Sequence, residues 1–283
     1  MNKIIYIGGI GHSGSTLLDI ILGEAANAMS CGQVGGIIDK TIDDNCACGK
    51  PIKDCPIWSD IFKVYLEKNW RSVFSRISKE RNLLKFLFSK NYCREYVTIN
   101  DQIFRHLFEI SKKQILIDSS KNISRGIAFV QESNYELYFL HLIRDSRGYI
   151  NSYNKRQVES NEKVGLIKPF LSWLIKNTSA SILGRFFYRK RYFQIKYEDL
   201  VTKPVDTIDY ISSKTGIEKK SIISRIKNHE EFNIRHIFSG NRISKHPVVL
   251  KTRNKKTYKL HHFRDSLFWY SLGFITKLWG YSK

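Results

Sequence analysis

The sequence predicts an α/β fold, in which a parallel β-sheet is flanked by helices. Short apolar runs bounded by turn residues alternate with segments of helical length, as in strand–helix–strand units. The first apolar run leads directly into a glycine-rich turn and the start of an amphipathic helix, at residues 4–23. That order is typical of a P-loop-like phosphate-binding unit. The 283 residues show no internal repeat and no low-complexity linker, so we expect a single domain, residues 1–283.

The strands are predicted where apolar residues cluster between turn signals. They are residues 3–9, 114–118, 135–143 and 191–197. Two helices between these strands are predicted at residues 123–133 and 147–157. This alternation favours parallel pairing, because each helix carries the chain back to the start of the next strand.

Three further segments complete the predicted domain. Residues 58–111 look wholly helical and form a helical insertion after the first strand region, as a lid or a wall of the site. Residues 209–227 give two short helices broken at Gly216. Residues 229–283 form a basic loop followed by a C-terminal helix. Residues 229–262 show little periodicity, which favours a long functional loop there.

The chain is strongly basic. It has 47 Lys+Arg against 26 Asp+Glu, a formal net charge of +21, which implies an anionic partner. A nucleic-acid-binding protein would carry a continuous basic stripe with aromatic platforms. Here the basic residues are spread along the chain and are densest from Arg235 to Arg264. We therefore expect no nucleic acid as a partner.

The sequence shows neither a signal peptide nor an apolar run long enough to span a membrane, which requires about 18 residues. We therefore expect a cytoplasmic protein. The aromatic C-terminal segment, residues 266–283, fits two roles. It either docks on the domain as a terminal helix or makes a peripheral contact with the inner face of the membrane.

Three of the five cysteines lie in the stretch CACGKPIKDCPIW, as Cys46, Cys48 and Cys55. Their spacing offers three thiolates with no fourth ligand nearby, so it falls short of a four-ligand structural zinc site. The absence of a secretory signal disfavours a disulfide framework. The sequence therefore predicts a compact loop near the mouth of the site, and no metal ion.

The glycine-rich turn follows the Walker A pattern from Gly9 to Thr16, but Ser15 stands where that pattern has lysine. Successive backbone N–H groups at a helix N-terminus bind a phosphate or a sulfate without a side-chain charge. The expected contacts come from Ser13, Gly14, Ser15, Thr16 and Leu17. The alternative is a tight packing turn without a ligand, which the hydroxyl-rich stretch SGST disfavours.

A second motif follows a later strand, in the stretch LHLIRDSRGYINSYNKR. Arg144 leaves the strand directly, and Ser152 lies eight residues on, inside the next helix. An arginine in that place can bind a phosphate through two parallel hydrogen bonds, and the serine reaches the same anion. Two anion sites imply a ligand with phosphates on two different carbons. The alternative is an ordinary salt bridge from Arg144 to Asp145 or Asp118.

Together these motifs resemble the sulfotransferase superfamily, in its bacterial branch, whose sulfuryl donor is 3′-phosphoadenosine 5′-phosphosulfate (PAPS). The resemblance runs from the first strand to about residue 243. It implies that the glycine-rich loop cradles the 5′-phosphosulfate and that Arg144 and Ser152 bind the 3′-phosphate. The stretch IDSSK puts Lys121 at the active-site lysine position, and YEDL puts Tyr197 beside the adenine. The stretch GNR, Gly240, Asn241 and Arg242, would be the late loop that closes over the donor.

The resemblance also implies the reaction, an in-line transfer of the sulfuryl group from PAPS to an acceptor hydroxyl without a metal. The acceptor is expected on a saccharide or glycolipid, with a tyrosylprotein acceptor as the alternative. Lys121 would stabilise the charge on the bridging oxygen. His12 stands where relatives have lysine or arginine, and it either contacts that oxygen or only packs the loop.

The general base is open, because Gln33 stands where relatives often have a glutamate, and an amide does not accept a proton at neutral pH. Asp118, Asp39 and His12 are the candidates, and Asp118 could instead orient Lys121 or cap the next helix.

A different enzyme class is also open, a divergent P-loop kinase or NTPase. It requires the Walker lysine, which Ser15 replaces, and a metal-binding carboxylate, for which Asp118 is the candidate.

Overall fold

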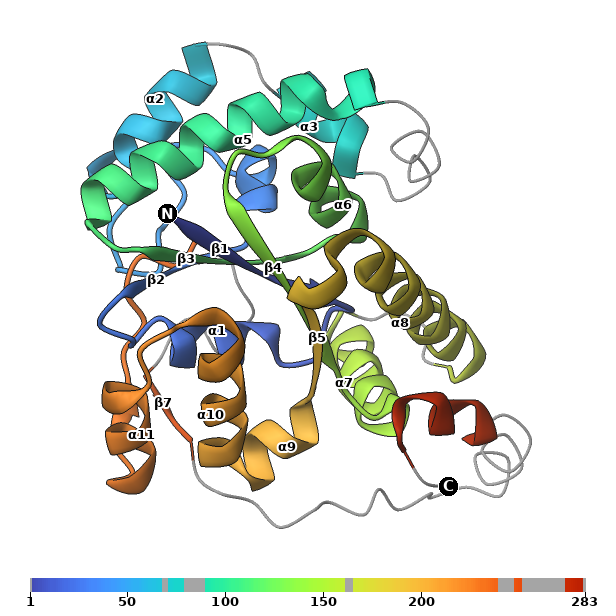
Figure 1. The fold of residues 1–283 in the computed structure, drawn as a ribbon. Coiled ribbons are helices and arrows are strands. Elements are labelled where there is room, and N and C mark those ends of the chain that lie inside the picture. Colours follow the sequence, from blue (N-terminus) through green and yellow to red (C-terminus); the bar gives the residue numbers. More distant parts are fainter. Residues whose placement is uncertain are drawn as a thin grey trace.

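The structure, a computed structural model, describes residues 2–67, 71–78, 90–160, 165–238, 247–250 and 273–281. Its centre is a five-stranded sheet in the order β2-β3-β1-β4-β5, with every neighbouring pair parallel (Figure 1). The strands are β1 (Lys3–Gly9), β2 (Ala28–Gly32), β3 (Ile115–Lys121), β4 (Glu136–Ile143) and β5 (Tyr192–Lys196). The predicted α/β fold is confirmed, and β2 is the strand of this sheet that the sequence did not predict.

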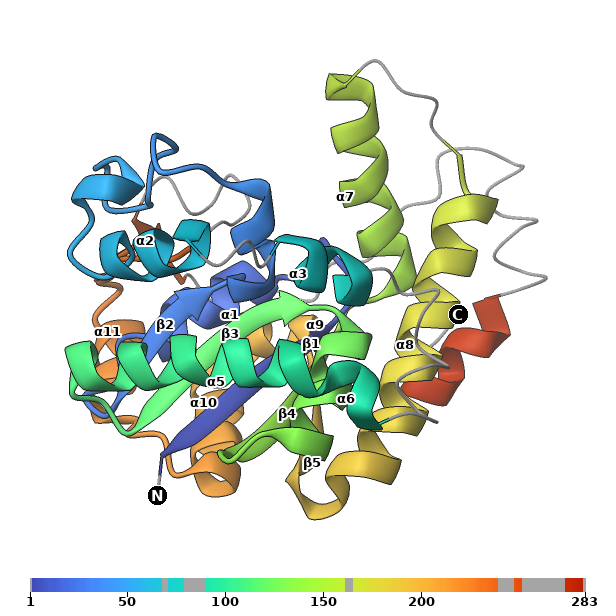
Figure 2. The ribbon, with the colours of Figure 1, turned by 90° about the horizontal axis from the view of Figure 1, so that it is seen from above.

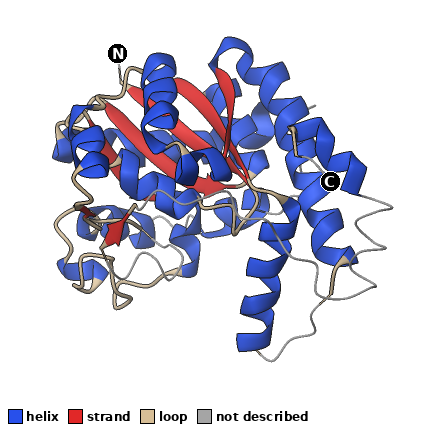
Figure 3. Cartoon of the chain, turned by 90° about the horizontal axis from the view of Figure 1, so that it is seen from below, coloured by secondary structure: helices blue, strands red, loops and turns tan. Residues whose placement is uncertain are grey.

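Helices cover both faces of the sheet (Figures 1 and 3). On one face lie α5 (Lys90–Ser111), α6 (Ile123–Glu132) and α8 (Ile167–Tyr188); on the other lie α1 (Ser15–Leu22), α10 (Pro204–Thr215) and α11 (Lys220–Lys227). Strand β1 shows how the sequence builds these layers. Ile4 and Tyr6 point into the first core, whereas Ile5 and Ile7 point into the second, because side chains alternate along a strand.

The segment predicted as a helical insertion lies between β2 and β3. Its described helices are α2 (Ser59–Glu67), α3 (Arg71–Ser78) and α5, and they lie above the sheet in Figure 1. Two more helices follow strand ends, α7 (Ser146–Glu159) after β4 and α9 (Tyr197–Thr202) after β5. Figure 2 shows α7 projecting away from the body of the domain.

The remaining elements are short. The 3₁₀ turns are η1 (Val34–Asp39), η2 (Ile52–Asp54), η4 (Arg189–Arg191) and η6 (Gly273–Trp279). Two described parts of the predicted long basic loop pair as antiparallel strands, β6 (Glu231–Phe232) and β7 (Val248–Val249). Beyond β6, Phe238 pairs in parallel with Gly32 at the end of β2, which brings the late part of the chain back to the sheet.

The described part of the C-terminal segment packs on the domain. Trp279 donates from Nε1 to Ser181 Oγ over 3.1 Å, and Tyr281 donates to a Glu198 carboxylate oxygen over 2.9 Å. Leu278 on the same turn is 79% exposed, and the alternative role, a peripheral membrane contact, stays a prediction. Of the helices in the described ranges, none has the length and apolar character needed to cross a membrane.

His141 is a fully buried histidine on β4, and it gives the fold a pH dependence. Its ring lies 2.9 Å from the Tyr192 hydroxyl and 3.0 Å from Asn177 Oδ1. Burial lowers the pKa of His141 from 6.5 to about 4. Between these two pH values the unfolded chain binds a proton that the folded chain excludes, so stability falls as the pH falls.

We expect the free energy of unfolding to fall between pH 7 and pH 5 by about 2 kcal/mol more in the wild type than in His141→Phe. Urea unfolding of both proteins at the two pH values measures this difference. Parallel pH curves would contradict it. The absolute stability of the variant does not affect the test, because only the change of the unfolding free energy with pH is compared.

Candidate active site

All five strands of the sheet end at one edge, and several of the predicted site residues lie there. Lys121 ends β3, Arg144 follows β4 and Tyr197 follows β5, while residues 10–14 follow β1 and Gln33 follows β2. In the register of the sheet, Gly8 pairs with Lys121 and Gly9 with Leu142. The strand order therefore puts the glycine-rich loop between Lys121 and Arg144, at the edge where ligands of parallel sheets bind.

The glycine-rich loop has a backbone that few residues adopt. His12 has φ +62° and Gly14 has φ +95°, and a Cβ at Gly14 would lie 2.4 Å from the Tyr197 ring. Helix α1 starts at Ser15 without a side-chain cap, and uncapped N–H groups at a helix N-terminus can bind an anion. Ser13 Oγ is buried and, within the described residues, has no hydrogen-bond partner. These features match a phosphate-binding loop.

Arg144 is held on the loop but is not neutralised by the acids nearest in sequence. It donates from Nη1 to the His12 carbonyl over 2.9 Å, and its guanidinium lies 4.5 Å from the Tyr197 ring centroid. Asp145 is instead paired with Arg147, at 2.7 Å. Arg144 Nε is buried and lacks a hydrogen-bond partner in the described part of the chain. A buried donor of this kind is costly to leave unpaired, which favours a ligand acceptor.

Ser152 and Arg144 meet at His12. Ser152 Oγ lies 3.3 Å from His12 Nδ1, so the two anion-binding motifs predicted from sequence are joined through one residue. The pKa of His12 is lowered, first by burial and then by the charges of Arg156, Lys121 and Arg144. His12 is therefore neutral at neutral pH, and it supplies a hydrogen bond or accepts a proton rather than supplying charge.

Arg156 is a site residue that sequence reasoning missed. It lies on α7 one turn after Ser152, and its charge acts on both His12 and Lys121. Its spacing of four residues from Ser152 could have predicted it, because residues four apart share one face of a helix.

Lys121, the predicted active-site lysine, is a cation whose charge acts on His12. It has φ +68°, and burial lowers its pKa to about 8, against the opposing charge of Asp19. Asp19 also went unnoticed in the sequence. It is buried in α1, accepts hydrogen bonds from Ser30 and Ser119 over 2.6 and 2.7 Å, and has its pKa raised to about 7 by burial.

Asp118 lies next to the site but is committed to the core. Its side chain is fully buried, and Arg125 donates to Oδ2 from Nε over 3.0 Å and from Nη2 over 2.7 Å. Ser120 also donates to it, from both its N–H and its hydroxyl. Through these contacts Asp118 holds the Arg125 side chain in the core. The cap of helix α6 is Asn122, which accepts from Arg125 N–H over 3.2 Å.

The other candidate residues divide into those described and those outside the described ranges. Asp39 is exposed at the end of η1, and the side chains of Ser15, Thr16 and Leu17 are buried in the first turn of α1. Gly240, Asn241 and Arg242, predicted to close over the donor, lie outside the described residues.

The fold of the chain is similar to that of sulfotransferase domains of known structure. The sulfotransferase domain from the Synechococcus PCC 7002 olefin synthase matches with a TM-score of 0.53 and 16% identity, over 100% of this chain and 95% of its own. The chain has the sulfotransferase fold. The sulfotransferase domain from the curacin biosynthetic pathway matches with a TM-score of 0.52 and 14% identity, over 96% of this chain and 98% of its own. The sequence matches no protein-family model and no curated protein sequence.

Proposed function

We propose that this chain is a PAPS-dependent sulfotransferase. The observation that carries the proposal is the meeting of two anion-binding elements at His12, one from the loop after β1 and one from the end of β4 and helix α7. Each element holds a buried polar atom without a partner among the described residues, Ser13 Oγ and Arg144 Nε. A ligand with phosphates on two carbons would satisfy both.

The residues fit the roles that the sulfotransferase fold requires. The amides of residues 13–17 and Ser13 Oγ hold the 5′-phosphosulfate, and Arg144 and Ser152 hold the 3′-phosphate. Tyr197 packs against Gly14 and Arg144, and we assign its ring to the adenine. PAPS supplies a sulfuryl group attached to a phosphate that is a good leaving group.

Lys121 and His12 carry the chemistry in this proposal. The Lys121 ammonium stabilises the negative charge that develops on the bridging oxygen, in a site where burial strengthens its effect. His12 accepts the proton of the acceptor hydroxyl. Among the four residues considered, Gln33 cannot accept a proton, Asp118 is bound to Arg125, and Asp39 is exposed. His12 alone combines a neutral ring nitrogen with a place on the loop.

The kinase or NTPase alternative is disfavoured by two features of the site. Ser15 stands at the position of the Walker lysine, where a nucleoside triphosphate needs a cation on its outer phosphates. Asp118, the candidate metal carboxylate, is bound by Arg125 at 2.7 Å. A magnesium ion would have to displace that guanidinium.

The acceptor is proposed to be a hydroxyl of a saccharide or glycolipid. The motifs resemble the bacterial branch of the superfamily, and the net charge of +21 favours an anionic acceptor such as an acidic polysaccharide. Transfer of labelled sulfuryl groups to acidic polysaccharides, neutral glycans and tyrosine peptides compares the acceptor classes. Preferential labelling of the tyrosine peptides would overturn the saccharide assignment.

The experiment that tests the function is calorimetric titration with adenosine 3′,5′-bisphosphate and with ATP–Mg²⁺. We expect the bisphosphate to bind and ATP–Mg²⁺ to bind at least about tenfold more weakly, because the loop has no lysine for the outer phosphates. Metal-dependent ATP binding without bisphosphate affinity would overturn the proposal and support the kinase alternative.

A further inference from the structure

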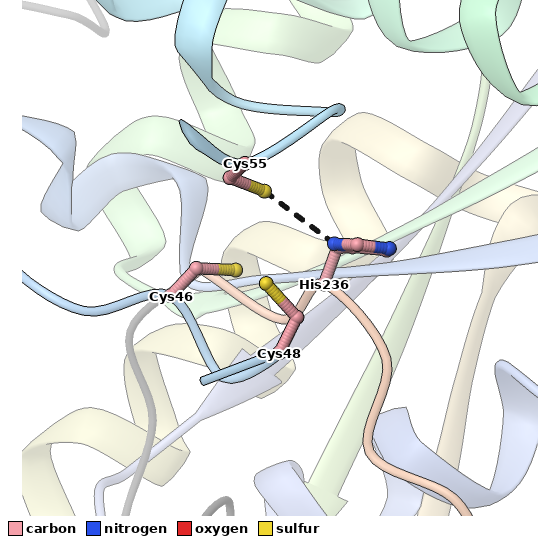
Figure 4. A group of neighbouring side chains, drawn as sticks. All are labelled: Cys46, Cys48, Cys55 and His236. Atoms are coloured by element: carbon pink, nitrogen blue, oxygen red, sulfur yellow. Dashed lines mark hydrogen bonds between the residues drawn. The ribbon is translucent and has the colours of Figure 1, made fainter. Parts of the chain in front are cut away.

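The three cysteines of the stretch CACGKPIKDCPIW meet a histidine from a distant part of the chain. Cys46, Cys48, Cys55 and His236 each offer one ligand atom, and these four atoms lie within 4.8 Å of one another. Figure 4 shows the four side chains converging on one point, three from the loop before α2 and one from the segment after β6. The sequence predicted no metal because no fourth ligand lies nearby. The structure supplies it from 181 residues beyond Cys55.

The spacing of these atoms fits a tetrahedral ion. Cys55 Sγ lies 3.4 Å from His236 Nδ1. Around tetrahedral zinc, bond lengths of about 2.3 Å to sulfur and 2.0 Å to nitrogen put sulfur and nitrogen about 3.5 Å apart and two sulfurs about 3.8 Å apart. The upper bound of 4.8 Å exceeds these separations by about 1 Å, so small side-chain movements would complete the site.

The loop is built to present its thiols from a rigid turn. Asn45 and Pro51 pair as an isolated antiparallel bridge. Inside it, Cys46 N–H donates to the Lys50 carbonyl over 2.9 Å, and Gly49 N–H donates to the Cys46 carbonyl over 3.0 Å. Gly49 has φ +86°, a conformation that favours glycine. Cys46 and Cys48 therefore lie on one tight turn.

The histidine is also held in place without a metal. Trp58 donates from Nε1 to the His236 carbonyl over 2.6 Å, and the Trp58 ring lies 4.8 Å from that of Phe238. Phe238 in turn is paired with the end of β2, where its N–H donates to the Cys31 carbonyl over 3.0 Å. Backbone contacts thus fix the position of the fourth ligand, as the outer contacts of structural metal sites do.

We propose that Cys46, Cys48, Cys55 and His236 form a structural zinc site. Four protein ligands leave no open position for water or substrate, so the site is structural rather than catalytic. Cys46 and Cys55 are buried in the core, which limits exchange with solvent.

The zinc would tie the loop that precedes α2 to the segment at residues 236–238. In the sequence, one residue separates that segment from Gly240, Asn241 and Arg242. The proposal does not depend on the reaction, because metal content is measured without an assay of transfer.

Metal analysis of the full chain, purified under reducing conditions without chelator, tests the site. We expect about one zinc ion per chain in the wild type, falling below about 0.1 in His236→Ala and Cys55→Ser. The matched controls are His229→Ala, an exposed histidine, and Cys93→Ser, a buried cysteine outside the cluster. Both should keep the zinc. Equal loss in the controls would overturn the assignment.

A second variant separates loss of a ligand from loss of the fold. His236→Cys should retain about one zinc ion, and X-ray absorption at the zinc edge should change from three sulfurs and one nitrogen to four sulfurs. A zinc-free wild type, or a disulfide between these cysteines in non-reducing mass spectrometry of the native chain, would overturn the proposal. None of the five cysteines forms a disulfide in the structure.

Discussion

Replacing Lys121 with alanine will leave adenosine 3′,5′-bisphosphate bound and reduce sulfuryl transfer about 100- to 1,000-fold. The phosphate contacts come from the loop and from Arg144, so affinity for the product depends on them. The ammonium group of Lys121 matters most where negative charge develops during transfer. Turnover with the acceptor identified by labelling, together with calorimetry, separates the two effects.

The sign of the pH effect follows from the lowered pKa of Lys121. Its pKa is about 8 because of burial, so the ammonium form is present below pH 8 and is lost as the pH rises through that value. Transfer by the wild type should therefore decline above pH 8. The control is Lys190→Ala, which removes an exposed lysine from η4 and should change neither turnover nor binding. Unchanged turnover in Lys121→Ala would remove this residue from the mechanism.

Replacing Asp118 with asparagine will lower the free energy of unfolding by about 3–5 kcal/mol, because it leaves the buried Arg125 charge without its partner. Both side chains are almost fully buried, at 0% and 2% exposure. The Arg125 guanidinium lies 4.4 Å from the Phe129 ring centroid, and its burial shields it from the solvent water that would otherwise replace the carboxylate. Urea unfolding measures the loss.

The same variant shows whether Asp118 is the general base of the reaction or only the partner that holds Arg125. Turnover per folded molecule should be retained, since His12 rather than Asp118 accepts the proton in our account. The control Asp60→Asn breaks an exposed pair with Lys63 and should cost about 0–1 kcal/mol. If Asp118→Asn were as stable as the wild type but inactive, Asp118 would be the base and our assignment would be wrong.

The sequence predicted the strands whose residues are strongly apolar and failed where the signal was weak. Strand β1 was predicted with its observed bounds, and β4 and β5 within one residue at either end. Strand β2, with the sequence AMSCG, has no β-branched or aromatic residue to mark it, and its pairing depends on β3 beside it. Its register with β3 shifts between Ser30 and Gly32, which no local pattern encodes.

The site residues, too, were predictable from sequence only in part. The residues at strand ends were predictable, because parallel strands bring their carboxyl ends to one edge. The partners of charged residues were not, since Asp118 could pair with several arginines and the fold selects Arg125. His236 likewise meets the three cysteines because Phe238 pairs with β2 and Trp58 binds the His236 carbonyl. These are contacts between distant parts of the chain.

The central claim is that two separate elements grip phosphates on two different carbons of one nucleotide. It is tested most directly by titrating wild type and Arg144→Ala with adenosine 3′,5′-bisphosphate and with adenosine 5′-monophosphate, which lacks the 3′-phosphate. Lys190→Ala controls for the loss of one positive charge. We predict that the wild type binds the bisphosphate about 10- to 100-fold more tightly than the monophosphate. Arg144→Ala should lose most of that preference while binding the monophosphate nearly as the wild type does. An undiminished preference in Arg144→Ala would contradict the account.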